Sequence, residues 1–127
     1  MRRTRPPTAA LVLSLGLIAI GAAARAGEAD VLAVQATREL GEYWRFDVTV
    51  AHADTGWDHY ADKWDVLSLD GQNLGSRVLA HPHQDEQPFT RSLGGVAIPP
   101  EVTTVTVRAH DLVHGYGGRE MTVELPR

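Results

Sequence analysis

The side chains best suited to metal chemistry are six histidines, all of which fall in or beside three short segments. Neutral imidazole binds zinc and copper(II) well. The chain has no cysteine, which excludes thiolate-based zinc sites and blue-copper sites. Imidazole must therefore supply most of the affinity, and we expect zinc or copper(II) as the ion. The predicted ligands are His52, His59, His81, His83, His110 and His114.

Spacing and neighbouring residues support this expectation. His81-Pro82-His83 puts two imidazoles two residues apart, so both can reach one ion from an extended backbone. Carboxylates beside the histidines are expected either to bind the ion or to orient a ring N–H. These are Asp58, Asp62, Glu86 and Asp111.

A second interpretation applies to two of these aspartates together with Asp54. Asp54, Asp58 and Asp62 stand at four-residue intervals, which is reminiscent of a calcium loop. The odd-position spacing and the distal Glu of such a loop are missing. We therefore interpret the three aspartates as solvated surface charges.

Aromatic residues in the same segments offer an alternative function. Exposed aromatic side chains among Asp and Asn can stack on a sugar or anchor a protein partner. They can also fold back as a lid over the end of a small domain. The residues concerned are Trp57, Tyr60, Phe89 and Tyr116.

Nothing in the chain predicts an enzyme. The serines beyond residue 26 are Ser68, Ser76 and Ser92, and none lies in a G-x-S-x-G nucleophile elbow. His110 and Asp111 are neighbours that point to opposite faces of a strand, so they form a poor general-base pair. We expect a non-catalytic protein.

These side chains need strands to position them, and Tyr43–His52 is the clearest. Trp44, Phe46, Val48 and Val50 alternate with polar residues, as in a strand with one buried face. The buried register, carried one step further, ends on His52. The same reasoning predicts strands over Val31–Thr37, Tyr43–His52, Lys63–Leu69, Leu74–Leu79, Phe89–Ile98 with a bulge at Gly94-Gly95, Val102–His110 and Glu120–Leu125.

Seven short strands with regular turns predict an all-β fold, an antiparallel immunoglobulin-like or fibronectin-like sandwich. Trp64 is a candidate for the tryptophan that packs in the core of such folds, although the alternation around it is ambiguous. In this topology the loops after the second and sixth strands share one end with the loop that enters the fifth. The histidines are then expected to converge at that end.

The first 26 residues have the features of a secretory signal peptide. Arg2, Arg3 and Arg5 precede an apolar run, Leu11–Ile20, and Ala24-Arg25-Ala26 is an A-x-A cleavage site. We expect Sec-type export, cleavage after Ala26, a periplasmic or secreted protein and no stable membrane anchor afterwards. Residues 27–127 form one predicted domain, whose eight basic and 16 acidic residues argue against nucleic acid as a partner. A metal ion or a periplasmic protein is the expected partner.

One segment resembles a known family. The stretch A-H-D-L-V-H-G-Y-G-G followed by R-E-M-T-V is similar, over that hairpin alone, to the CopC-like periplasmic copper carriers, which place an Asp and a His near the tip of their last hairpin. Those carriers also use a histidine at the mature N-terminus, where this chain has Gly27-Glu28-Ala29. The resemblance implies a copper-binding sandwich for sequestration or delivery, without assigning membership.

Overall fold

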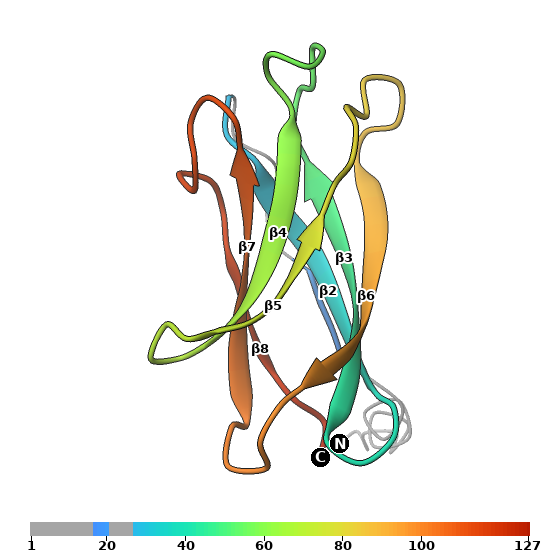
Figure 1. The fold of residues 1–127 in the computed structure, drawn as a ribbon, viewed down its shortest axis with the longest axis vertical. Coiled ribbons are helices and arrows are strands. Elements are labelled where there is room, and N and C mark those ends of the chain that lie inside the picture. Colours follow the sequence, from blue (N-terminus) through green and yellow to red (C-terminus); the bar gives the residue numbers. More distant parts are fainter. Residues whose placement is uncertain (1–16, 21–26) are drawn as a thin grey trace, which may run out of the picture.

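The computed structural model describes residues 17–20 and 27–127, and over these residues it contains strands and no helix. Two antiparallel sheets pack face to face (Figure 1), with strand orders β1-β2-β3-β6 and β5-β4-β7-β8. The strands are β1 (Leu17–Ile20), β2 (Asp30–Arg38), β3 (Tyr43–Ala51), β4 (Ala61–Ser68), β5 (Asn73–Val78), β6 (Phe89–Ala97), β7 (Thr104–Asp111) and β8 (Met121–Glu124).

The predicted all-β sandwich is confirmed, and each of the seven predicted strands overlaps one of β2–β8. The fourth of these, β5, pairs with β4, whereas a constant-type immunoglobulin domain places its fourth strand in the other sheet. The strand β1 is additional. It lies within the predicted signal peptide and pairs with β2, while residues 1–16 and the cleavage site lie outside the described residues.

The core follows from the alternation in β3 and β7. Trp44, Phe46, Val48 and Val50 are buried from one sheet, and β7 shows the same alternation of buried and partly exposed residues from the other. Within residues 27–127, the buried hydrophobic side chains run from Ala29 to Leu125. The described core therefore lies between Ala29 and Leu125, with β1 paired to β2 at the edge of the same sheet.

Strand β4 departs from simple alternation, because five consecutive residues from Trp64 to Ser68 are buried. Trp64 packs in the core as expected. Asp65 faces the other side and is covered there by Ser76, Tyr116 and Arg108, which donate hydrogen bonds at 2.6, 2.8 and 3.2 Å. These covering side chains explain why the sequence pattern around Trp64 is ambiguous.

The bulge in β6 is confirmed. Trp44 pairs with Val96 and Phe46 pairs with Leu93, so Gly94 and Gly95 together stand opposite one residue of β3. The described residues include no helix that is long and apolar enough to cross a membrane. The β3–β4, β5–β6 and β7–β8 loops all lie at one end of the sandwich (Figure 1), where the histidine-bearing segments meet.

Candidate metal centre

His52 lies one residue beyond β3 and continues its inward register, so its side chain is fully buried. The ring Nδ1 lies 2.5 Å from Asp54 Oδ1. Since an ionised carboxylate can only accept, His52 Nδ1 carries the hydrogen, and in the neutral ring Nε2 then has the lone pair, directed away from Asp54. This is the tautomer in which Nε2 can bind a metal ion.

Asp54 holds that arrangement in place. Its Oδ1 also accepts a hydrogen bond from the Ala61 amide at 3.0 Å, and Oδ2 accepts one from the His83 amide at 2.7 Å. One buried carboxylate therefore joins the end of β3, the start of β4 and the β5–β6 loop. Our interpretation of Asp54 as a solvated charge is wrong, because two backbone amides and an imidazole surround it and leave it 7% exposed.

Asp111 ends β7 in the same inward register and is completely buried. The amides of Val113 and His114 donate to its Oδ1 at 2.8 and 2.5 Å, while Oδ2 has no hydrogen-bond partner within the described residues. Burial alone would raise the pKa of Asp111, but the two amides and the nearby His52 and His114 outweigh it and lower the pKa below its usual range. Asp111 is therefore ionised at neutral pH, and its Oδ2 keeps the capacity to bind a cation.

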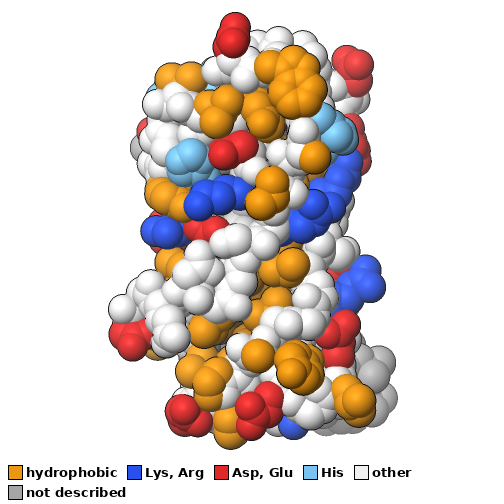
Figure 2. Space-filling model, in the orientation of Figure 1, with side chains coloured by type: hydrophobic (Ala, Val, Ile, Leu, Met, Phe, Trp, Pro, Cys, Tyr) orange, Lys and Arg blue, Asp and Glu red, His pale blue; other side chains and the backbone are white. Residues whose placement is uncertain are grey.

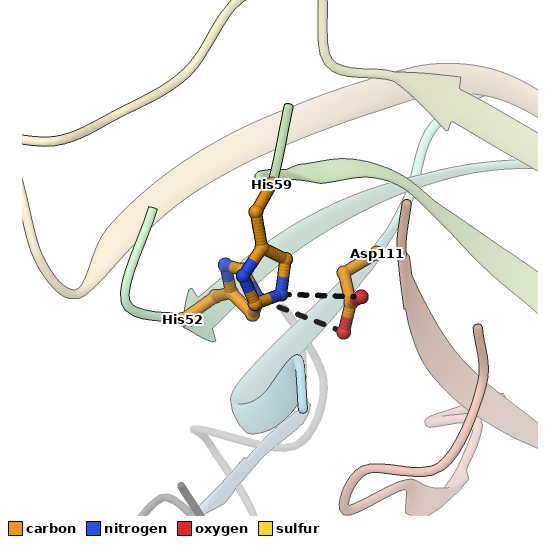
Figure 3. Close-up of side chains that lie close together, drawn as sticks. All are labelled: His52, His59 and Asp111. Atoms are coloured by element: carbon orange, nitrogen blue, oxygen red, sulfur yellow. Dashed lines mark hydrogen bonds and ion pairs between the residues drawn. The ribbon is translucent and has the colours of Figure 1, made fainter. Parts of the chain in front are cut away.

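His59, from the β3–β4 loop, completes a cluster with His52 and Asp111 (Figure 3). The two Nε2 atoms are 3.2 Å apart, and each lies 3.5 Å from an oxygen of Asp111. Two nitrogens bound to one ion at about 2.0–2.1 Å with a tetrahedral angle are separated by about 3.3–3.4 Å. The three donors thus already stand at the separations that a shared ion requires.

His114 stands at the rim of this cluster. Its Nδ1 lies 3.4 Å from Asp111 Oδ1, and its ring centre is 5.1 Å from that of His59. The side chains of His59 and His114 are 24% and 38% exposed, whereas those of His52 and Asp111 are buried. The cluster is therefore closed on the core side and open to solvent through these two rings.

The H-P-H segment takes a different role. His83 is buried against Phe89, with stacked rings 4.1 Å apart. Its Nδ1 is 4.0 Å from Asp54 Oδ2, and neither ring nitrogen has a hydrogen-bond partner within the described residues. Burial, then the charges of Arg91 and His81, lower the pKa of His83. His81 is exposed and bonds to the Pro82 carbonyl, so the structure does not bring this pair into the cluster.

His110 is the remaining predicted ligand, and it faces outward because it precedes Asp111 in β7. Its Nδ1 lies 2.6 Å from Asp62 Oδ1, and its ring contacts that of Tyr116. The guanidinium of Arg108 stacks 3.7 Å from the centre of the same tyrosine ring. Histidine side chains are exposed in the upper part of the face in Figure 2, with Lys and Arg side chains beside them. This outer group is separate from the buried cluster.

The other predicted residues lie further from the cluster. Asp58 is exposed, and Glu86 is exposed and pairs with Arg91 at 3.0 Å. Among the aromatic residues, Phe89 is buried in the core, while Trp57 is 66% exposed with its ring edge to Tyr60. Trp57 therefore projects into solvent and does not form a closed lid.

Comparison with curated proteins shows similarity to an archaeal protein. A protein of Halomicrobium mukohataei described as "Putative lipoprotein" is 45% identical over 97 residues, which cover 76% of this chain and 47% of that protein. The chain thus spans about half the length of this relative. No family model and no solved structure matches the chain.

Proposed function

We propose that this domain is an exported protein that binds one divalent transition metal ion, copper(II) or zinc, for sequestration or delivery. His52 Nε2, His59 Nε2 and the Asp111 carboxylate are the ligands. The observation that carries the proposal is the 3.2 Å separation of two imidazole nitrogens beside a carboxylate oxygen that accepts no hydrogen bond from the described residues.

The surroundings of the cluster suit a metal ion. Asp54 fixes the His52 tautomer that presents Nε2, and a carboxylate behind a ligating imidazole also makes the ring a stronger donor. The lowered pKa of Asp111 keeps its charge available to offset that of a cation. Three protein ligands leave room for a further donor on the open side, which suits release as well as uptake.

Export is supported by two independent observations. The first 26 residues have the pattern of a signal peptide, and the relative is described as a lipoprotein, which is an exported class. A site without cysteine also suits an oxidising compartment, because it offers no thiol to oxidise.

The test is the unfolding midpoint of Gly27–Arg127, without a His tag, in EDTA, zinc and copper(II). A metal that binds only the folded state stabilises it by about 2.7 kcal/mol at a hundred times its Kd. We expect a saturable rise at one ion per chain that is lost in His59→Ala and kept in His110→Ala, which removes an imidazole outside the cluster. Binding should also weaken below about pH 6, where imidazole generally becomes protonated. Equal midpoints in EDTA and in both metals at pH 7.5 would refute the proposal.

The alternative, a recognition module for a protein or carbohydrate, is favoured by one observation. Trp57, Leu112 and Val113 are 66%, 47% and 60% exposed, and all three come from the loops that carry the cluster. Binding of this kind should be lost in Trp57→Ala and survive His59→Ala, so the same two variants separate the functions.

A further inference from the structure

The outer edge of β2 is occupied by β1. Leu17–Ile20 pairs antiparallel with residues 33–36, and β1 also lies close to β8 of the other sheet. The first residues of β2 have a different neighbour, because the Val31 amide donates to the Arg119 carbonyl at 2.9 Å. From residue 33 to residue 38, the only described strand on this side of β2 is therefore β1.

This strand lies within the predicted signal peptide, so cleavage after Ala26 would separate it from the domain. The edge of residues 33–38 would then present backbone N–H and C=O groups without strand partners. The Glu39 amide donates to the Tyr43 carbonyl on the β3 side, and the direction of these groups alternates along a strand. The residues whose backbone groups face the open edge are therefore Val34, Ala36 and Arg38.

The other sheet edges carry features that discourage pairing with another chain. Strand β6 has Arg91 and the bulge at Gly94-Gly95, and β5 carries Arg77. Strand β8 is only four residues long and is soon followed by Pro126. By contrast, residues 33–37 of β2, A-V-Q-A-T, contain no charge, no proline and no bulge. Without β1, this edge is the one best suited to accept a strand from another chain.

We propose that removal of the signal peptide opens this edge and that a second copy of the chain occupies it, with the two β2 strands paired antiparallel about a twofold axis. Twofold dimers are the commonest oligomers of soluble proteins, and addition of a strand to an exposed sheet edge is a recurrent mode of recognition. An antiparallel strand already fits this edge, as β1 shows. The precursor caps its own edge, and the processed protein dimerises after export. The inference depends on cleavage after Ala26 and not on metal binding.

The backbone limits the registers of this dimer, because hydrogen-bonded pairs must join residues whose amides face the edge. The two registers that overlap residues 33–38 best pair Val34 with Ala36 of the second copy, or Ala36 with itself. In the first register Gln35 stands opposite Gln35 of the second copy, and in the second it stands opposite Thr37. Gln35 is exposed and Thr37 is partly exposed. Charges of one sign at both positions would therefore meet in either register.

The experiment uses the full chain, expressed with its signal peptide, purified from the periplasm without a tag and weighed to locate its first residue. Sedimentation equilibrium in EDTA measures the dimer Kd, so that no metal ion bridges two copies. Gln35→Lys/Thr37→Lys should raise this Kd by about fivefold or more, because like charges stand opposite each other. The control Thr90→Lys/Thr122→Lys adds the same charge at exposed positions of β6 and β8 and should keep the wild-type Kd. Circular dichroism checks that both variants keep their sheets.

A second measurement uses the absence of cysteine from the chain. Residues directly opposite each other in an antiparallel pair have Cα atoms about 4.5–5.5 Å apart, a separation that a disulfide can bridge. Under mild oxidation, Gln35→Cys/Thr37→Cys should form a covalent dimer, and Thr90→Cys/Thr122→Cys should not.

Three results would overturn the inference. The first is a processed protein that is monomeric at every concentration. The second is a dimer that the two Gln35/Thr37 variants affect no more than their controls do, because the copies would then meet through another surface. The third is a mature protein that keeps residues 17–20, since its edge would stay paired. None of these results bears on the proposed metal site, whose test is the response to zinc and copper(II).

Discussion

Asp54→Asn is the substitution that tests most directly how the cluster is built. The Asp54 carboxylate accepts three hydrogen bonds, from His52 Nδ1, the Ala61 amide and the His83 amide. Asparagine has almost the same shape but only one acceptor oxygen. If that oxygen keeps the His52 and Ala61 contacts, its NH2 group faces the His83 N–H, and two donors oppose each other.

The size of the effect follows from these contacts. A buried donor left without a partner costs about 1–3 kcal/mol, which lowers the unfolding midpoint of a domain this size by about 4–8 °C per kcal/mol. Loss of the charged partner behind a ligating imidazole usually weakens metal binding by about 10–100-fold, equivalent to about 1.4–2.8 kcal/mol. Asp54→Asn should therefore lower both the stability in EDTA and the metal affinity.

The assay measures urea unfolding in EDTA and the copper(II) and zinc Kd by chelator competition. Asp62→Asn is a matched control, because Asp62 also bonds a histidine Nδ1, at 2.6 Å, but about a quarter of each side chain is exposed. It should change stability by less than about 1 kcal/mol and leave the Kd unchanged. A folded Asp54→Asn protein with wild-type metal affinity would show that Asp54 does not set the His52 tautomer, and this reasoning would be wrong.

Two further predictions concern stability. Burial first, then nearby positive charges, lower the pKa of His83, so the folded state binds a proton less readily than the unfolded state, and this contribution to stability is lost as the pH falls below about 6.5. His83→Phe should reduce the difference in urea midpoint between pH 7.5 and 5.5. His81→Phe should reduce it much less, because it removes only one nearby charge, and equal reductions in the two variants would contradict this. Gly118→Ala places a methyl group onto the Ala29 carbonyl oxygen, and should destabilise the domain by about 3 kcal/mol or more in urea unfolding. Gly94→Ala meets only the flexible end of a side chain and should cost about 1 kcal/mol or less; similar costs for both would refute the packing argument.

The strands could be predicted because their pattern is local. Alternation in Tyr43–Ala51 and Thr104–Asp111 arises from one face packing on the opposite sheet and one facing water. The bulge at Gly94-Gly95 was also visible, since paired glycines interrupt an apolar run. In β4 this rule fails, because side chains from β5, β7 and the β7–β8 loop cover the outer face around Asp65. Nothing in the sequence of β4 itself indicates that side chains from other segments cover its outer face.

The positions of the histidines predicted correctly at which end of the sandwich the site lies. They did not show which histidines form the cluster and which have other roles. His83 donates its amide to Asp54 and buries its ring against Phe89, so it supports the cluster without belonging to it. Asp54 looked like one of a series of surface acids, because its buried position depends on amides from two other segments. Such contacts between distant segments have no counterpart in the spacing of residues along the chain.

One signal in the sequence does point to the cluster, and it is the continuation of a buried register beyond its apolar residues. In β3 the inward positions run through Val48 and Val50 to His52, and in β7 they run through Val107 and Ala109 to Asp111. Both side chains are therefore carried between the sheets at the same end. A titratable residue in such a position must be satisfied by a partner, and here the two meet with 3.5 Å between His52 Nε2 and Asp111 Oδ2. The alternating inward-facing positions of β3 and β7, more than the number of histidines, thus identify the buried half of the site. His59 and His114 then define its open side.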